Sequence, residues 1–280
     1  MIKIQTIGII GQGFVGNAVK EGLKSCFEII TFDKISTKST ESSITALVEK
    51  SDTIFLCLPT PMKKSGECDI SILDNVLQEI NRINKKSIII IKSTIPPGTT
   101  VALQQKYTNI RLIFNPEFLT EANSVDDYKN QTRIIFGGDY DDISCVQLIF
   151  QKCYPKATII KTSSTIAEMI KYITNTFLAT KISFANEIYQ ICRTLNIDYD
   201  KVIEYTKYDD RLGYSHWSVP GPDGDFGYGG HCFPKDISGL KYLANQLNVV
   251  TTMLDATIAK NNETRTFRDW ELQKGRAVSD

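Results

Sequence analysis

The sequence predicts an α/β fold, in which a doubly wound parallel sheet forms the N-terminal part and helices form the remainder. Three observations lead to this fold class. Short apolar segments alternate with helical patterns as far as Ile160, a glycine-rich turn follows the first of them, and Thr165–Asn196 contains neither proline nor glycine. Alternating strands and helices are typical of parallel sheets, and the uninterrupted segment predicts one long helix.

Composition favours a small-molecule partner. The chain has 280 residues, of which 42% are hydrophobic, and this is enough apolar content for two domains. Its 32 basic and 32 acidic residues leave no net charge, which argues against nucleic acid or a membrane surface as the main partner. Seven scattered cysteines and two histidines, His216 and His231, fit neither a disulfide framework nor a metal site. We therefore expect a cytoplasmic protein without a metal, neither exported nor membrane-anchored.

The glycine-rich turn predicts a dinucleotide site. Lys3–Ile10 becomes continuously apolar, as in a strand buried on both faces, and the G-x-G-x-x-G turn Gly11–Gly16 follows at once. Its glycines allow a tight bend and a close approach of the backbone to a pyrophosphate at the N-terminus of the next helix. A fortuitous glycine turn between two strands is the alternative interpretation.

An acidic residue indicates which dinucleotide is bound. Glu28–Phe32 is a second predicted strand, and Asp33 follows it at the position where a carboxylate can bond the ribose hydroxyls. The same carboxylate repels a 2′-phosphate, so we expect NAD rather than NADP, although Lys34 and Lys38 act against this preference.

Five further segments continue the alternation as predicted strands: Thr53–Leu58, Ser87–Lys92, Arg111–Asn115, Arg133–Phe136 and Thr158–Ile160. Helices are expected within Ile70–Asn84 and after Pro97-Gly98. Ligands of such sheets lie beyond the carboxyl ends of the strands, where three loops are candidates for binding: Leu58–Pro61, Ser93–Gly98 and Asn115–Glu121. The prolines in these loops, taken singly, are explained as residues that end strands.

Thr94, Glu117 and Glu121 are not explained in that way. Glu117 and Glu121 are four residues apart, so on a helical turn they would share a face. Two like charges on one face are unfavourable without a ligand or cation, which favours a binding site here. Solvated surface glutamates are the alternative.

The long helix Thr165–Asn196 predicts a connection between two domains and a surface for self-association. Glu168, Lys171 and Asn175 follow helical spacing and would form one polar stripe among apolar residues. An exposed Glu–Lys pair beside an asparagine is the alternative interpretation. Further helices are expected at Asp198–Tyr208 and Pro234–Leu247. The domain boundaries that follow are 1–164 for the nucleotide domain, 165–270 for the helical domain and 271–280 for a tail.

The segment Gly227–Asp236 predicts a nucleophile. Its sequence is Gly-Tyr-Gly-Gly-His-Cys-Phe-Pro-Lys-Asp. Pro234 fits the first turn of a helix, so Cys232 is expected near the positive end of that helix, with an ammonium and a carboxylate close behind. Such surroundings favour the thiolate, which attacks carbonyl carbons. A glycine-rich turn with an unreactive cysteine is the alternative.

Together these segments resemble the UDP-glucose/GDP-mannose dehydrogenase family, and within it the branch that oxidises UDP-glucose. Matching segments extend almost from end to end: Gly11–Gly16, Lys92–Thr99, Asn115–Glu121, Glu168–Glu187, Asp210–Gly213 and Gly229–Asp236. The resemblance implies an N-terminal Rossmann domain and a central helical dimerisation domain joined by the long helix. Two features depart from the family pattern. The chain ends soon after Asn261–Arg265, which suggests a short form lacking the family's C-terminal nucleotide-binding domain, and the loop Ser215–Asp225 is longer than usual.

The resemblance implies an NAD-dependent four-electron oxidation of UDP-glucose to UDP-glucuronate by a cytoplasmic homodimer. Cys232 would add to the C6 aldehyde as a thiohemiacetal, and the thioester formed by the second oxidation would be hydrolysed. Lys171 and Asn175 would stabilise oxygen charge at C6. Asp236 would orient water or accept a proton.

Further roles follow from the same resemblance. Glu117 would activate water for thioester hydrolysis, with Thr94 holding a bridging water. Arg211 would reach the sugar site of the neighbouring subunit, and Glu121 would lie beside the nicotinamide ribose. The predicted cofactor-binding residues are Gly11, Gly13, Phe14, Val15, Gly16, Asp33, Lys38, Pro59, Thr60, Thr94, Glu121 and Lys235. The predicted substrate-binding residues are Glu117, Phe118, Leu119, Lys171, Asn175, Arg211, Phe226 and Gly229.

Three other functions stay open from the sequence. The substrate could be a UDP-N-acetylhexosamine or GDP-mannose, since no residue distinguishes these sugar nucleotides from UDP-glucose. A two-electron β-hydroxyacid dehydrogenase would share the Rossmann domain, the long helix and a catalytic lysine, but it needs no thiol, so Cys232 argues against it. A non-enzymatic sensor of NAD or sugar nucleotides would not need the matched catalytic side chains.

Overall fold

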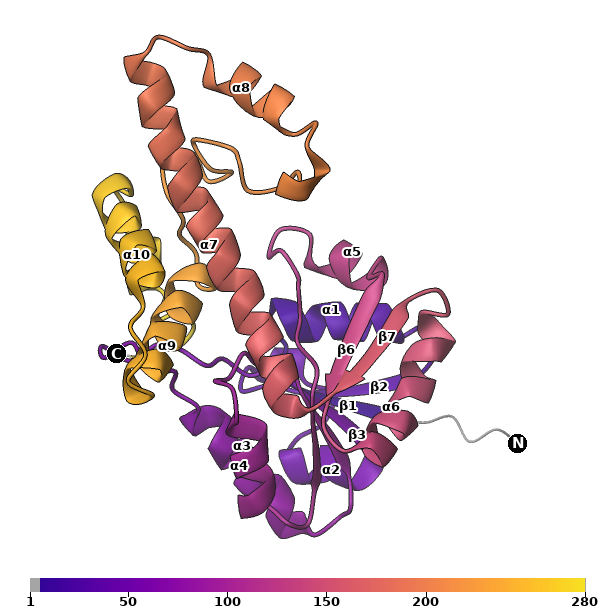
Figure 1. Cartoon of the computed structure of the whole chain (residues 1–280). Coiled ribbons are helices and arrows are strands. Elements are labelled where there is room, and N and C mark those ends of the chain that lie inside the picture. The colour runs from indigo at the N-terminus through magenta and orange to yellow at the C-terminus, as the bar shows by residue number, and fades with distance from the viewer. Residues whose placement is uncertain (1–5, 280) are drawn as a thin grey trace. The chain divides into compact units, whose positions relative to one another are not determined.

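The computed structural model of the chain describes residues 6–279, which fall into two compact units. Unit 1 comprises Met1–Thr60 and Ile70–Lys171, and unit 2 comprises Pro61–Asp69 and Tyr172–Asp280. The division after Lys171 lies inside one helix, α7 (Ser164–Thr194), which therefore contributes residues to both units (Figure 1). Of the first predicted strand, the part before Thr6 lies outside the described residues.

Unit 1 is built on a seven-stranded sheet with the order β2-β1-β3-β4-β5-β6-β7. The strands are β1 (Thr6–Ile10), β2 (Glu28–Phe32), β3 (Thr53–Leu56), β4 (Ile88–Ile91), β5 (Arg111–Phe114), β6 (Arg133–Gly137) and β7 (Thr158–Thr162). β1 to β5 pair in parallel, in a register that places Ile7 beside Ile29 and Thr53. The predicted α/β class is confirmed.

One strand pair corrects the expectation of a wholly parallel sheet. β5 and β6 are antiparallel and pair at Phe114 and Gly137. The connection between them contains the short helix α5 (Ser124–Lys129) and no long crossover helix, and a strand that re-enters at the edge where its neighbour ended runs antiparallel to it. β7 is parallel to β6 after the longer helix α6 (Tyr140–Cys153), so the last two strands oppose the first five.

Helices cover both faces of the sheet because successive strand residues point to opposite sides. The remaining helices of unit 1 are α1 (Phe14–Leu23), η1 (Ser36–Lys38), α2 (Ile44–Lys50), α3 (Ser71–Ile83) and α4 (Thr99–Lys106). α1, α5 and α6 pack on the face that buries Ile9 and Phe55, whereas α2, α3 and α4 pack on the face that buries Ile10 and Leu56 (Figure 1). Burial on both sides explains why these strands are continuously apolar.

Unit 2 is helical. Besides its part of α7 it contains α8 (Tyr199–Thr206), η2 (Asp210–Leu212), α9 (Phe233–Gln246), α10 (Thr252–Thr264) and η3 (Asp269–Leu272). The residues after η3 pack onto the segment Pro61–Asp69, where the Met62 N–H donates to the Ala277 carbonyl at 2.7 Å. Ala277 and Trp270 are buried. The end of the described chain is therefore part of the folded unit.

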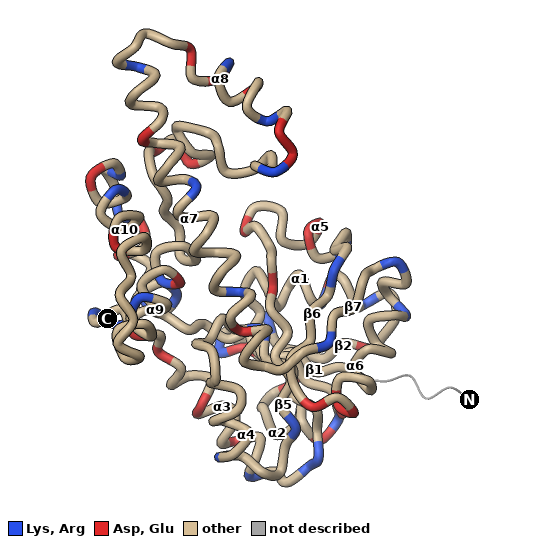
Figure 2. Tube along the Cα trace, viewed as in Figure 1, with Lys and Arg blue, Asp and Glu red and all other residues tan. Residues whose placement is uncertain are grey.

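Charge is spread over the trace. Figure 2 shows acidic and basic residues along both units, with the two signs interspersed along α8 and the loop that follows it. Among the described residues, no helix is long and apolar enough to cross a membrane.

Candidate active site

The glycine turn of unit 1 has the geometry of a pyrophosphate cradle. Gly11 adopts a φ of +93°, and a Cβ on Gly16 would overlap the Gly11 carbonyl oxygen, so both positions require glycine. A Cβ on Gly13 would meet no atom within 4 Å, which leaves open space at the N-terminus of α1. That terminus has no side-chain cap and no acidic residue in its first turn, so its N–H groups and the helix dipole suit an anion.

Asp33 and Lys38 lie beside this turn. Asp33 Oδ2 accepts the Gln12 N–H at 2.6 Å, and its Oδ1 accepts the Ile35 N–H at 2.9 Å. Lys38 Nζ donates to the Gln12 carbonyl at 3.4 Å. A fixed carboxylate at the end of β2, one glycine turn away from an anion cradle, fits the ribose and pyrophosphate of a dinucleotide.

The loops after β3 and β4 are joined to each other. Thr60 Oγ1 donates to the Thr94 carbonyl at 2.7 Å, and the Leu58 N–H donates to Ser93 Oγ at 3.0 Å. Thr60 and Thr94 are buried, and Pro59 is half-buried. The loops follow neighbouring parallel strands, so the register of the sheet brings these predicted cofactor residues together.

Glu117 and Lys171 form a buried ion pair in unit 1. Glu117 Oε1 lies 3.0 Å from Lys171 Nζ, with side-chain exposures of 5% and 4%. The Leu119 N–H donates to Glu117 Oε2 at 2.8 Å, and the ring centroid of Phe118 lies 5.6 Å from Lys171 Nζ. Burial alone raises the pKa of Glu117, but the charge of Lys171 and the backbone hydrogen bond outweigh it, so the pKa falls below its usual range. Glu117 is therefore ionised at neutral pH.

Glu121 does not share a helical face with Glu117. The chain between β5 and α5 is irregular, Glu117 is buried in it, and Glu121 lies exposed in a turn. The expectation of two stacked glutamates is wrong because Glu117 turns inward to Lys171.

Glu168 is also not part of an exposed pair with Lys171, so that alternative interpretation is wrong. Glu168 is fully buried, and its carboxylate accepts the Gly98 N–H at 2.6 Å, the Thr100 N–H at 2.8 Å and the Thr100 hydroxyl at 2.6 Å. These donors lie at the N-terminus of α4, where a carboxylate is favoured. Burial raises the pKa of Glu168, although the hydrogen bonds act in the opposite direction.

Sequence reasoning missed Lys92 and Asn115, which support the Glu117 segment. Lys92 Nζ donates to Asn115 Oδ1 at 2.7 Å, and Asn115 Nδ2 donates to the Ile135 carbonyl at 2.7 Å. Burial lowers the pKa of Lys92 to about 8, although Cys57 and Glu117 act to raise it. A lysine directly after the four isoleucines of β4 was the available signal.

Cys232 is the N-cap residue of α9 in unit 2, and Pro234 lies in the first turn, as predicted. Further along the same helix, Lys235 Nζ forms an ion pair with Asp236 Oδ1. Asp236 Oδ2 accepts a hydrogen bond from Asn175 Nδ2 at 2.5 Å. Burial alone lowers the pKa of Lys235, but Asp236 and Cys232 outweigh it, so the pKa is raised. The thiol thus lies near a persistent cation and a helix N-terminus, and both favour a thiolate.

The glycine loop before Cys232 is held by buried amides that the sequence did not reveal. The Gly227 N–H donates to Asn186 Oδ1 at 3.1 Å, and the Tyr228 N–H donates to Asn261 Oδ1 at 2.7 Å. Asn186 belongs to α7 and Asn261 to α10, so two helices fix one loop. No short sequence pattern connects residues so far apart.

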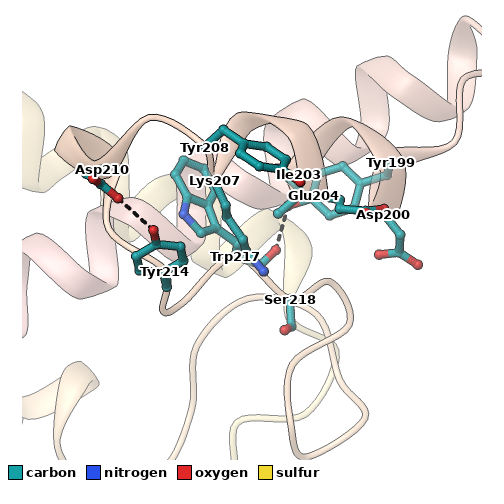
Figure 3. A pocket seen from close by; sticks show the side chains of 10 residues that line it. All are labelled: Tyr199, Asp200, Ile203, Glu204, Lys207, Tyr208, Asp210, Tyr214, Trp217 and Ser218. Atoms are coloured by element: carbon teal, nitrogen blue, oxygen red, sulfur yellow. Dashed lines mark hydrogen bonds between the residues drawn. The ribbon is translucent and has the colours of Figure 1, made fainter.

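Arg211 and Phe226 lie elsewhere in unit 2. Arg211 is exposed, and its Nη2 pairs with Asp209 Oδ2 at 2.5 Å. Phe226 packs on Tyr189, with ring centroids 5.7 Å apart. A cavity of about 630 Å³ lies along α8 and the following loop, where Tyr214 donates to Asp210 (Figure 3). None of the residues that line it was predicted as a site residue.

Within residues 6–279, no group of three or more His, Cys, Asp or Glu side chains could hold a metal ion.

Comparison with known proteins identifies the family. Residues 36–156 match the model of the UDP-glucose/GDP-mannose dehydrogenase family NAD binding domain, and residues 165–263 match the central domain of the same family. The chain belongs to the UDP-glucose/GDP-mannose dehydrogenase family. The predicted family and the predicted cofactor, NAD, are thereby confirmed.

Curated relatives include enzymes with different substrates in their names. UDP-glucose 6-dehydrogenase TuaD of Bacillus subtilis is 34% identical over 233 residues, which is 80% of this chain and 49% of the relative. GDP-mannose 6-dehydrogenase of Pseudomonas putida is 30% identical over 242 residues, 80% of this chain and 53% of the relative. The chain spans about half the length of the curated relatives it matches.

Solved structures share the fold. GDP-mannose dehydrogenase of Pseudomonas aeruginosa has a TM-score of 0.68 at 27% identity, covering 92% of this chain and 68% of that one. UDP-glucose dehydrogenase of Pyrobaculum islandicum has a TM-score of 0.85 at 23% identity, covering 93% and 68%. 3-Hydroxyisobutyrate dehydrogenase of Mycobacterium tuberculosis has a TM-score of 0.76 at 14% identity, covering 93% and 94%. At such low identity the last two show the fold alone.

Proposed function

We propose that this protein oxidises the C6 alcohol of UDP-glucose to a carboxylate in an NAD-dependent four-electron reaction. The observation that carries the proposal is the environment of Cys232 in a chain of this family: a thiol at the N-cap of α9, with the Lys235 ammonium nearby. A two-electron dehydrogenase has no use for such a thiol. The names of several curated relatives support UDP-glucose as the substrate.

The thiol divides a difficult oxidation into two easier ones. Bound NAD would supply the hydride acceptor for each oxidation. After the first, the Cys232 thiolate forms a C–S bond to the C6 aldehyde, and the resulting oxyanion takes up a proton to give a thiohemiacetal. Loss of hydride and a proton gives a thioester, and water then breaks the C–S bond to release the carboxylate and the thiol.

Lys171 and Asn175 would stabilise the charge that develops on oxygen during these steps. They lie one turn apart on α7, so a rigid helix fixes the spacing of an ammonium and an amide. Asn175 donates to Asp236, which also pairs with Lys235, and these contacts orient the Asp236 carboxylate for its proposed role in proton transfer.

Glu117 would act as the general base that activates water for thioester hydrolysis. Its lowered pKa, caused mainly by Lys171 acting against burial, supports this role because a base must be ionised to accept a proton. Thr94, buried in the loop after β4, would hold a bridging water.

The active species would be a homodimer. Arg211 is exposed on unit 2, as the residue that reaches a neighbouring subunit's sugar site would have to be. Sedimentation and activity measured on one sample test this, and a fully active monomer would contradict it.

A panel of sugar nucleotides tests the reaction and its substrate together. The purified protein is incubated with NAD and UDP-glucose, a UDP-N-acetylhexosamine or GDP-mannose, and both NADH and uronate are counted. We expect two NADH per uronate, with UDP-glucose the best substrate. One NADH per product and no uronate would instead favour a two-electron dehydrogenase. 3-Hydroxyisobutyrate dehydrogenase shares the fold of this chain.

A further inference from the structure

The loop Ser215–Asp225 is anchored to the segment that follows α10. Asp225 accepts the Thr266 hydroxyl at 3.0 Å and the Phe267 N–H at 3.2 Å. Asp223 Oδ2 lies 2.8 Å from Arg265 Nη2. The loop therefore ends in two carboxylates that engage residues more than 40 positions further along the chain.

Arg265 is at the centre of this contact. Its side chain is only 3% exposed, so its charge is removed from water and depends on the carboxylates around it. Nη2 contacts both Asp223 and Asp269 at 2.8 Å, and Nε donates to the Phe267 carbonyl at 2.9 Å. Removal of one carboxylate from such a group leaves part of a buried charge unpaired.

Arg265 and Asp269 lie directly against the backbone that leads to Cys232. Asp269 Oδ2 accepts the Gly230 N–H at 2.9 Å. A Cβ on Gly229 would overlap both the Arg265 guanidinium and the Asp269 carboxylate, so only glycine permits this contact. Gly230 has a φ of +68° and lies two residues before the thiol. Whatever fixes Gly230 therefore fixes the approach of the chain to the N-cap of α9.

We propose that Asp269 and Arg265, held by Asp223 of this loop, are positioning residues that set the Cys232 thiol at the N-terminus of α9. This inference rests on the proposed function, because it concerns the nucleophile of that reaction. Asp269 acts through a hydrogen bond to Gly230, and Arg265 acts through Asp269. The loop Ser215–Asp225 thereby acquires a role, since Asp223 supplies one of the two carboxylates that contact Arg265 Nη2.

The pH dependence of Cys232 alkylation tests this positioning without substrate. The full chain is treated with iodoacetamide between pH 6 and 10, and the modified peptide that contains Cys232 is counted by mass spectrometry. In Asp269→Asn the loop loses its charged acceptor, and the thiol moves away from the helix N-terminus and Lys235. We expect the midpoint of the alkylation rate to rise on the order of half a pH unit or more, with a slower rate at pH 7.5. In Asp269→Glu, which keeps a carboxylate, the midpoint should return part of the way to that of the unmodified chain.

Controls separate positioning from general loosening. Glu271→Gln changes a carboxylate of the same 3-10 helix that is exposed and pairs with Arg268 at the surface, and it should leave the Cys232 profile unchanged. The exposed Cys145 reports in each sample whether alkylation as such has changed. Asp223→Asn should shift the profile in the same direction as Asp269→Asn, but by less.

Folded Asp269→Asn and Asp223→Asn proteins whose Cys232 midpoints stay at that of the unmodified chain would overturn the proposal, as would a faster rate without a shifted midpoint. If Asp269→Asn does not fold, Arg265→Lys and Asp223→Asn decide by the same criterion. Failure of the proposed function would appear separately, as an unmodified protein that forms no uronate while the alkylation comparison remains readable.

Discussion

Two glycine-rich turns lead into helices in this protein, and they are built in opposite ways. Gly11–Gly16 leaves open space at Gly13 and ends in a helix N-terminus without a cap. Gly227–Gly230 donates backbone N–H groups to side chains of α7, α10 and η3, and Cys232 follows two residues later. The first turn suits a backbone that must admit a ligand. The second suits a backbone that must hold a side chain still.

The largest effect should come from removal of the group that the second turn holds. Cys232→Ser keeps the shape but replaces a readily ionised thiol with a hydroxyl that is far harder to deprotonate. We expect steady-state NADH production to be abolished while NAD and sugar nucleotide still bind, with at most a slow burst. Stopped-flow absorbance and equilibrium binding measure both, and turnover within a few-fold of the unmodified protein, with uronate formed, would refute the covalent step.

The first turn can be probed by a matched pair of alanines. In Gly16→Ala the new Cβ overlaps the Gly11 carbonyl, so we expect a loss of about 3 kcal/mol or more in the free energy of unfolding. In Gly13→Ala the Cβ enters open space, so the loss should be about 1 kcal/mol or less, while the KM for NAD rises about tenfold. Urea unfolding and NAD titration separate the two. Equal destabilisation by both changes would contradict the open cradle.

A smaller effect is expected at Asp33, which should determine the preference for NAD over NADP. Its carboxylate is fixed between the Gln12 and Ile35 N–H groups and repels a 2′-phosphate. NAD should be used at least about tenfold better than NADP, a difference of about 1.4 kcal/mol. Asp33→Ser should reduce this ratio because Lys38 remains beside the turn. Equal kcat/KM for both cofactors in the unmodified protein would disprove the assignment.

The last contrast is between two buried lysines. Asp236 keeps Lys235 charged, whereas burial lowers the pKa of Lys92 to about 8, from an ordinary value of 10.5. Between pH 8 and 10.5 the unfolded state holds more protons at Lys92, so its contribution to the free energy of unfolding rises with pH in that window. Below pH 8 both states are protonated and the contribution is constant.

Lys92→Met should remove this gain. Between pH 7.5 and 9.5, we expect the free energy of unfolding of the unmodified protein to rise by about 1–2 kcal/mol more than that of Lys92→Met. Urea unfolding measures both. The exposed Lys156→Met serves as the control and should follow the unmodified protein. A gain in Lys92→Met equal to that of the unmodified chain would show that Lys92 does not titrate in this range.

The local patterns of the sequence predicted much of the fold. β2 was placed at Glu28–Phe32, where the structure has it, and Asp33 was placed at its end, because apolar runs and glycine turns are local signals. The reversal at β6 was missed, since direction depends on where a connection returns. Lys92 with Asn115 was missed for a similar reason: their contact requires the register that sets Ile91 beside Phe114.

The supports of the Cys232 loop were beyond sequence reasoning. Arg265 meets Asp223 across 42 positions, and Asn186 meets Gly227 across 41. Nothing in the residue types says that an arginine after one helix will be buried against a glycine before another. Cys232 and Pro234 could be predicted because a helix N-terminus has a local signature.

The covalent intermediate on Cys232 is the most direct test of the proposed reaction. Glu117→Gln removes the proposed general base, so the thioester should form faster than it is hydrolysed. The variant is incubated with NAD and the best sugar nucleotide, quenched in acid and digested. The mass of the peptide that contains Cys232 is then measured by mass spectrometry. We predict a peptide heavier by the uronyl group of the sugar nucleotide, and none in the double variant with Cys232→Ser. An unmodified Cys232 peptide in samples that have produced uronate would contradict the mechanism.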